Sequence, residues 1–361
     1  MTQTAVPTTL EAILDIARWA PSGDNAQPWK FRITGDRDLD VFIQRTNPNI
    51  YEYREGEPTL LSAGGLLENI EIAAPAFGLK ARWRYTGSAD GIDCIAVHFS
   101  DTEALPTSEL LGEIARRSVD RRPYKMLALT GEHKERLAEA LGEGMQIQWF
   151  ESLSRRRSIA VLSGLATRIR LAIQETFSVH RNIVDWENSK SEHGIPSLAL
   201  GLDRMTLLLT RWSMANWGRT RFMNAMGAPT FASLQMDALP GLFCSSYFVI
   251  RLKRLSGEPG TAVVETIKAG QSIQRFWLTA SRLGLVMQPC IAPLAFWVHS
   301  ASGRNFTSNN SARKAAGRLA KAAEALLGQN ENVVFLGRIG WPRNVLESRS
   351  TRLRLEHLLV T

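Results

Sequence analysis

The segment 17–29 of this chain concentrates polar side chains directly after a helix end. It reads Ala-Arg-Trp-Ala-Pro-Ser-Gly-Asp-Asn-Ala-Gln-Pro-Trp, so that Pro21 ends the helix and Ser22, Asn25 and Gln27 follow it. Hydroxyl, amide and freed backbone N–H groups at such a place can both donate to and accept from a polar ligand. The alternative is an ordinary proline-terminated turn whose polar side chains satisfy their own backbone.

A second stretch, residues 116–124, is rich in arginine. It contains Arg116, Arg117, Ser118 and Arg121, followed by Arg122. Planar guanidinium groups with several donors match a dianionic phosphate well. A solvated, basic surface is the alternative interpretation.

No other constellation of residues indicates catalysis or metal binding. Five of the histidines are scattered, and none has a partner that would make it a general base. The three cysteines, Cys94, Cys244 and Cys290, lie far apart and match no disulfide or zinc spacing, which is typical of a reducing compartment. We therefore predict no catalytic side chain and no metal site.

The elements that position these residues follow from periodicity and capping. Thr8 and Glu11 have capping-box spacing ahead of a helix that runs to about residue 19. Strands are expected at 30–33, 41–43, 81–85, 94–99, 246–252 and 333–341. Helices are expected at 61–77, where Gly78 would end the helix, and at 261–284 and 311–327. Another helix is expected to begin after Thr130, which would cap it.

Residues 101–108 have the composition of a linker, and residues 152 to about 225 are predicted to be mostly helical, with a polar break at 187–194. Trp212 and Trp217 are expected in the core of this helical region; a lid or substrate wall is the alternative. Helices and strands in this order indicate mixed α+β layers rather than regular βαβ units.

Composition and charge narrow the class of protein. The 361 residues are 44% hydrophobic and 22% charged, as in ordinary globular proteins, and the net charge is +8. The run at 155–157 is the best candidate for nucleic-acid contact, but it lacks interleaved aromatic residues and is predicted to be a solvated helix face. No secretory signal or membrane-spanning segment is expected, so we predict a cytoplasmic protein without a nucleic-acid or membrane partner.

Three stretches together resemble the nitroreductase family of FMN-binding proteins, in the order in which that family uses them. The segment 17–29 is similar to the family's alanine-proline-serine, asparagine and glutamine-proline-tryptophan motif, and 116–122 to its arginine- and serine-containing opening segment. Residues 284–292, Gly-Leu-Val-Met-Gln-Pro-Cys-Ile-Ala, are similar to the segment after its long central helix. Two positions depart from the family. In 284–292, Ile291 replaces a frequent acidic residue, and in 116–122, Asp120 stands where a basic residue is common.

The resemblance implies which residues hold FMN. Pro21, Ser22, Asn25 and Gln27 would contact the flavin from one side, and Gln288, Pro289, Cys290, Ile291 and Ala292 from the other, with Pro289 on the ring and the N–H of Ile291 or Ala292 near N5. Arg116 or Arg117, with Ser118, would grip the phosphate; Arg121 would replace the missing charge. A basic residue near the C-terminus would also reach the phosphate, and Arg352 is the better candidate and Arg338 the weaker one.

The resemblance is closest to the fused subgroup that includes Acg-like proteins, and it implies two related α+β halves forming an internal pseudo-dimer, with antiparallel or mixed sheets flanked by helices. The halves would be 1–106 and 107–361, the second with a helical insertion around 152–230. They would share one flavin site in a monomeric pseudo-dimer or a homodimer. The implied activity is an FMN-dependent oxidoreductase acting on a small organic substrate, with NAD(P)H as a transient donor. A flavin-sequestering protein with little turnover is the alternative.

Overall fold

The chain folds as a mixed α+β protein with two antiparallel four-stranded sheets. The computed structural model describes residues 7–45, 49–102, 106–253, 261–330 and 332–360. The first sheet has the order β1-β2-β4-β3, formed by Trp29–Ile33, Asp38–Gln44, Ile92–Asp101 and Leu79–Ala89. The second has the order β10-β11-β9-β5, formed by Val286–Pro289, Val333–Gly340, Ser246–Leu252 and Met145–Phe150. The expected α+β class with antiparallel sheets is confirmed.

The two sheets share one connectivity. Read from the edge that holds its first strand, each sheet has its strands in the order first, second, fourth, third along the chain: β1-β2-β4-β3 and β5-β9-β11-β10. In each sheet a long helix connects the second strand to the third. That helix is α2, Glu57–Ala73, in the first case and α11, Thr261–Arg282, in the second. A helix precedes each first strand as well: α1, Thr9–Ala17, before β1, and α4, Gly131–Leu141, before β5.

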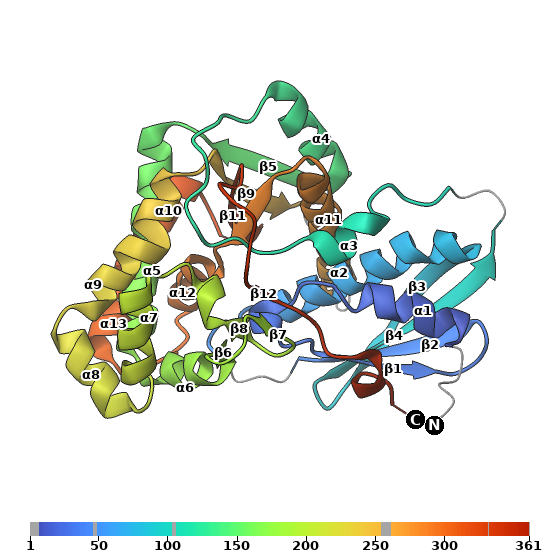
Figure 1. Ribbon diagram of the computed structural model, residues 1–361, viewed down its shortest axis with the longest axis horizontal. Helices are drawn as coiled ribbons and strands as arrows, with labels where there is room; N and C mark the ends of the chain where they lie inside the picture. Colours follow the sequence, from blue (N-terminus) through green and yellow to red (C-terminus); the bar gives the residue numbers. More distant parts are fainter. Residues whose placement is uncertain (1–6, 46–48, 103–105, 254–260, 331, 361) are drawn as a thin grey trace.

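The helices α2 and α11 lie side by side at the centre of the molecule (Figure 1). Their backbones meet at two glycines. A Cβ on Gly64 would lie 2.0 Å from the carbonyl oxygen of Ile267, and one on Gly270 would lie 2.2 Å from that of Leu61. Only residues without a side chain permit this approach, because real Cβ atoms do not come so near to a neighbouring backbone.

Several predicted elements are confirmed with small changes at their ends. Thr8 and Glu11 form the expected capping box at α1, and Thr130 caps α4. The predicted strand at 246–252 is β9, the predicted helix at 311–327 is α13, Asn310–Leu327, and Gly78 ends the helical stretch with a φ of 69°. The predicted linker at 101–108 includes residues 103–105, which lie outside the described part of the chain.

The long connection between β5 and β9 is mostly helical, as predicted. Its helices are α5, Leu153–Ala172; α6, Gln174–Ile183; α7, Arg204–Ser213; α8, Trp217–Ala225; α9, Ala228–Ser233; and α10, Leu239–Leu242. The polar break at 187–194 contains the short strand β7, Lys190–Ser191, and is flanked by β6, Val184–Asp185, and β8, Ile195–Pro196. Two details differ from expectation. Trp212 is 45% exposed, because α7 turns its apolar stripe outward, and Arg156 is buried, donating to the carbonyl oxygens of Leu242 and Cys244.

The C-terminal tail runs back from the second sheet to the first (Figure 1). The tail leaves β11 of the second sheet and passes through β12, Arg349–Ser350, which pairs with β7. It then forms a short 3-10 turn at Leu355–His357, and Leu359 makes a parallel bridge to Phe31 of β1. The short helix α3, Leu111–Arg116, lies earlier in the chain, between β4 and α4. The remaining helix, α12, is Ile291–Ala301. Among the described residues, no helix is both long and apolar enough to cross a bilayer.

Candidate functional site

The loop after α1 is held in a strained backbone conformation. Asp24, Asn25 and Gln27 have φ values of 51°, 58° and 50°. Side chains other than glycine seldom adopt positive φ, although aspartate and asparagine tolerate it best. The conformation is held locally by the Ser22 hydroxyl, which accepts a hydrogen bond of 2.9 Å from the backbone N–H of Gln27. Strained backbone of this kind is concentrated at functional sites.

The amide side chains of this loop bind other parts of the protein. Asn25 donates to the carbonyl oxygens of Glu192 at 3.0 Å and Thr351 at 3.1 Å. Gln27 donates to the Glu192 carbonyl at 2.9 Å and accepts from the N–H of Leu353 at 2.9 Å. Both amides therefore fasten the C-terminal tail and the β7–β8 connection to the first half. Pro21 lies against α2, where it would contact a Cβ on Gly65.

Three arginines from distant parts of the chain converge on the end of α1. Arg117 is buried, donates to the carbonyl oxygen of Trp19 at 3.2 Å and lies 4.4 Å from the ring centre of Trp277. Arg352 donates to the carbonyl oxygen of Ala20 at 2.9 Å, and the Arg349 guanidinium lies 5.3 Å from the Trp19 ring centre. The arginine segment and the C-terminal tail thus meet beside the loop that carries Ser22.

The three arginines, here called the arginine triad, have no carboxylate partner among the described residues. Burial lowers the pKa of Arg117, and the charges of Arg352 and Arg349 lower it further. Burial and the charge of Arg349 lower the pKa of Arg352 to about 9. The Nε atoms of Arg117 and Arg349 are buried without a hydrogen-bond partner. Uncompensated, partly unsatisfied cations are costly, so this arrangement suits an anion with several acceptor oxygens.

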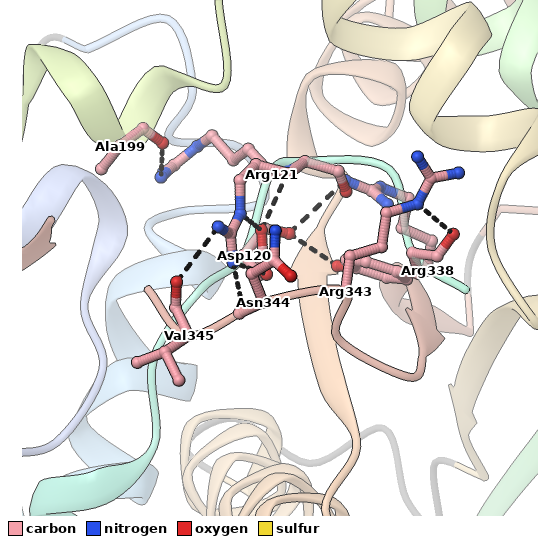
Figure 2. Close-up of polar contacts among 9 residues, drawn as sticks. Asp120, Arg121, Ala199, Arg338, Arg343, Asn344 and Val345 are labelled. Carbon is pink, nitrogen blue, oxygen red and sulfur yellow. Dashed lines mark hydrogen bonds and ion pairs between the residues drawn. The ribbon is translucent and has the colours of Figure 1, made fainter. Parts of the chain in front are cut away.

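The other predicted phosphate contacts lie elsewhere. The Arg116 side chain is 73% exposed and pairs with Glu113 at 3.3 Å. Ser118 is half-buried in the segment that follows. The Arg121 guanidinium donates to the carbonyl oxygen of Ala199 at 3.2 Å, and Figure 2 shows it directed toward Ala199, away from Arg338 and Arg343. The structure therefore does not bring Arg121 together with Arg352, because Arg121 donates to Ala199, whereas Arg352 donates to Ala20 at the end of α1.

Arg121 belongs to a second polar group, which sequence reasoning missed. Burial raises the pKa of Asp24, and the charges of Arg121 and Arg170 oppose this shift. The Tyr51 hydroxyl lies 2.8 Å from Nε2 of His180. Burial, with the charge of Arg170, lowers the pKa of His180 to about 3. These five residues come from three separate regions, including helices α5 and α6 of the long connection, and no spacing in the sequence links them.

The predicted flavin turn is the end of β10 and the start of α12. The Gln288 side chain accepts from Nε of Arg338 at 2.7 Å, and Pro289 ends the strand opposite Gly337. The backbone N–H of Cys290 donates to the Leu336 carbonyl oxygen, and burial raises the pKa of the Cys290 thiol to about 12. This thiol is therefore not an activated nucleophile.

Ile291 and Ala292 begin α12, and no side chain caps this helix end. The first N–H groups of a helix have no intrahelical acceptor, so those of Ile291 and Ala292 are available to an external one. The charge of Arg170 also acts on the neighbouring Cys290 thiol, which brings this turn within electrostatic range of the second polar group. The turn and the second polar group thus belong to one region.

Arg338 holds the second sheet to its surroundings. The side chain is 1% exposed and donates to the carbonyl oxygens of Pro240, Asp120 and Arg122 as well as to Gln288. Its guanidinium also lies 4.1 Å from the ring centre of Tyr124. With all these donors engaged, Arg338 is a structural residue and is not available to a phosphate (Figure 2).

Comparisons with known proteins give similar structures but no similar sequence. No protein-family profile matches the chain, and no curated protein matches it. A nitroreductase-like family protein from Bacillus cereus is similar at 10% identity over 71% of this chain and 98% of its own, with a TM-score of 0.36. A nitroreductase with bound FMN from Desulfitobacterium hafniense covers 71% of this chain and 100% of its own, at 13% identity and a TM-score of 0.35. A structure from Anabaena variabilis covers 85% of this chain and 69% of its own, at 11% identity and a TM-score of 0.42.

Proposed function

We propose that the chain is an FMN-dependent oxidoreductase that passes hydride between a nicotinamide or organic donor and a small organic acceptor through a bound flavin. The observation that carries this proposal is the arginine triad. Arg117 and Arg352 are buried and Arg349 is half-buried, and all three lie beside the Ser22 loop without a carboxylate partner among the described residues. A flavin phosphate is a dianion with three acceptor oxygens. The residues present therefore fit the phosphorylated cofactor that the sequence resemblance implies.

The rest of the proposed site extends from the arginine triad to the start of α12. The N–H groups of Ile291 and Ala292 would lie at the reactive edge of the ring, where a donor stabilises charge on a reduced flavin. When bound, FMN would supply the hydride-accepting chemistry, so no acid or base of this chain need act directly on the substrate. Arg121, Arg170 and Tyr51 would line the substrate side, favouring acceptors with oxygen atoms such as quinones and nitroaromatics.

We also propose that the site is shared by two related halves, 1–106 and 107–361, arranged as an internal pseudo-dimer. The common strand order of the two sheets and the close contact of α2 with α11 support this arrangement. Gly64 and Gly270 are each followed, fourteen residues later, by a Gly-Leu pair at 78–79 and 284–285. Each half would contribute only part of one flavin site.

A titration with FMN and riboflavin tests the phosphate assignment, because the two ligands differ only in the phosphate. The Arg352→Gln variant should lose about 1.5–3 kcal/mol of FMN affinity, which is roughly a tenfold to hundredfold weakening. Its affinity for riboflavin should stay unchanged. Flavin fluorescence quenching measures both.

Two neighbouring arginines serve as matched controls for that titration. Arg116→Gln removes an exposed guanidinium one residue from Arg117 and should leave both affinities unchanged. Arg121→Gln should leave the ratio of FMN to riboflavin affinity unchanged, because Arg121 lies with Asp24 and Arg170. A protein that binds neither ligand would refute the flavin assignment itself. If the ratio of FMN to riboflavin affinity falls only in Arg121→Gln, the phosphate lies at Arg121 and not at the arginine triad.

A flavin-sequestering protein is the second candidate, and one feature favours it. The β7–β8 connection is fastened onto the Ser22 loop by Asn25 and Gln27, so the long connection covers this side of the proposed site. Adding NADH or NADPH to the flavin-loaded protein without oxygen distinguishes the candidates. Bleaching within seconds supports turnover, and a flavin that dithionite reduces but neither nucleotide does supports sequestration.

A further inference from the structure

Helix α7 exposes an apolar stripe to solvent. Met205, Leu208, Leu209 and Trp212 follow the spacing i, i+3, i+4 and i+7, and they are 65%, 65%, 46% and 45% exposed. A surface helix of a globular protein normally turns such a stripe inward. Here no described residue of α7 or of α8 is buried, so the stripe contributes nothing to the core.

The neighbouring helices extend this apolar surface. Phe222 and Met226, at the end of α8, and Phe231 of α9 are each more than half exposed. Gln235 donates to the Asp203 carboxylate at 2.6 Å, which joins the start of α7 to the segment after α9, and α8 contacts both α7 and α9. On the inner side, Trp217 contacts Phe177 at 5.4 Å between ring centres. We call the exposed side chains of α7, α8 and α9 the outer face.

The charged residues of α7, α8 and α9 themselves are all arginines, and the exposed Asp203 caps the start of α7. Residues 204–235 contain four arginines, Arg204, Arg211, Arg219 and Arg221, and no aspartate or glutamate. Arg211 pairs with Glu187 from outside this stretch, and Arg219 lies 5.0 Å from the Trp212 ring centre. Arg204 and Arg221 are exposed, and neither forms an ion pair within the described part of the chain. Arg204 and Arg211 each precede a residue of the apolar stripe and so flank it on one side.

We propose that the outer face docks onto an anionic membrane surface. Large apolar side chains with arginines along one edge are the pattern of helices that lie in the interface of a bilayer. Tryptophan and arginine suit this boundary, since each places an apolar body against lipid and a polar group in water. This proposal is independent of the flavin site, and it needs no helix that spans the membrane.

Charge favours lipid over a second copy of the chain. A twofold interface would set the same surface against itself, so the arginines of one copy would meet those of the other. The nearby acidic groups are already engaged, since Glu187 pairs with Arg211 and Asp203 accepts from Gln235. Anionic headgroups compensate the same arginines, and each basic residue near such a surface adds about 1 kcal/mol, or roughly fivefold in affinity.

Co-sedimentation of the full-length protein with lipid vesicles tests the proposal. Vesicles of phosphatidylcholine with roughly one third phosphatidylglycerol should bind the protein at least about tenfold more strongly than phosphatidylcholine alone, and about 0.5 M salt should remove the difference. The Leu208→Ser/Trp212→Ser variant should bind at least about tenfold more weakly to the anionic vesicles. Arg204→Gln/Arg221→Gln should weaken binding by roughly the same factor.

A matched control removes a similar exposed apolar area from another surface. Met126→Ser/Leu127→Ser removes two side chains of similar exposure from another surface and should bind as the parent does. Thermal unfolding of each variant shows whether it is folded. Equal binding to both kinds of vesicle would overturn the proposal. So would a dimer in vesicle-free solution that Leu208→Ser/Trp212→Ser converts to a monomer, because the outer face would then be a contact between copies.

Discussion

The two sheets have the same strand order but very different surroundings. In the first sheet β4 alternates between buried and exposed residues, so only one face of the sheet is covered. Every residue of the corresponding strand β11 is buried. In β9, Tyr247 and Val249 belong to one apolar cluster, and Phe248 and Ile250 belong to another on the opposite face.

The difference comes from layers that only the second sheet has. The helices α5, α12 and α13 cover the face of β9 and β11 that corresponds to the open face of the first sheet. The connection from the first strand to the second is residues 34–37 in one sheet and residues 151–245 in the other. A long insertion at such a hairpin costs little in loop-closure entropy, so it can be added without changing the order of the strands.

The added layer also creates the interior in which the polar groups of the second half lie. The charges of Arg338 and of Arg170 from α5 both act there to lower the pKa of the Cys290 thiol and of the Asp237 carboxyl, against the effect of burial. The open face of the first sheet carries solvated side chains instead, such as Arg32 paired with Asp40. The second layer thus gives one face of the second sheet a buried polar interior that the corresponding face of the first sheet lacks.

The largest effect is expected at the contact between α2 and α11. Gly64→Ala and Gly270→Ala should each destabilise the protein by about 3 kcal/mol or more, because each added Cβ would meet backbone of the opposite helix. If the two halves are equivalent, the two losses should be equal within about 1 kcal/mol. Urea unfolding, followed by circular dichroism, measures both.

Gly65→Ala is the control, since it changes the adjacent residue of the same helix. A Cβ there would lie 3.5 Å from Pro21, an ordinary contact, and alanine favours a helix by up to about 1 kcal/mol over glycine. This variant should be as stable as the parent or more so. Equal stability of the Gly64 and Gly65 variants would contradict the contact between α2 and α11.

Two buried arginines provide the next test, since Arg338 lies on β11 of the second sheet and Arg352 lies at the proposed ligand site. Arg338→Met should cost about 3 kcal/mol, because it leaves Gln288 and three carbonyl oxygens without their donor. Arg352→Gln removes an uncompensated charge and should change the stability of the flavin-free protein by less than about 1 kcal/mol. Denaturant unfolding of stripped protein compares them. A similar loss in both would mean that Arg352 is structural.

Sequence reasoning predicted all four strands of the first sheet, but only β9 and β11 of the second, and only part of the candidate site. The strands β5 and β10 were missed. Local signals such as the Thr8 capping box, the Gly78 stop and the apolar strand at 246–252 depend on near neighbours, and they predict the corresponding elements well. Near neighbours in the sequence do not explain why Arg117 lies with Arg349 and Arg352 while Arg121 does not. Arg117 and Arg121 lie in one basic segment. The C-terminal tail, which Asn25 and Gln27 fasten in place, brings its two arginines beside Arg117.

The second polar group shows the same limit. Tyr51, Arg170 and His180 come together because the insertion folds over the first half, and no spacing relates them. The sequence likewise did not predict that the apolar stripe of α7 faces outward. Its periodicity predicts a helix that buries Trp212, whereas the direction in which that helix faces depends on which layers are present around it.

The smallest predicted effect is a dependence of stability on pH that arises where His180 of α6 contacts Tyr51. Burial lowers the pKa of His180 from 6.5 to about 3, so the folded protein holds this ring neutral while the unfolded chain protonates it below pH 6.5. Its contribution is fully present above pH 6.5 and is lost as the pH falls, by about 1.4 kcal/mol per pH unit. Between about pH 7.5 and pH 5 the parent should therefore lose about 2 kcal/mol more than His180→Gln, which keeps an acceptor for the Tyr51 hydroxyl. Urea unfolding at the two pH values measures the difference, and equal losses in the two proteins would mean that His180 is solvated and that α6 does not close over Tyr51.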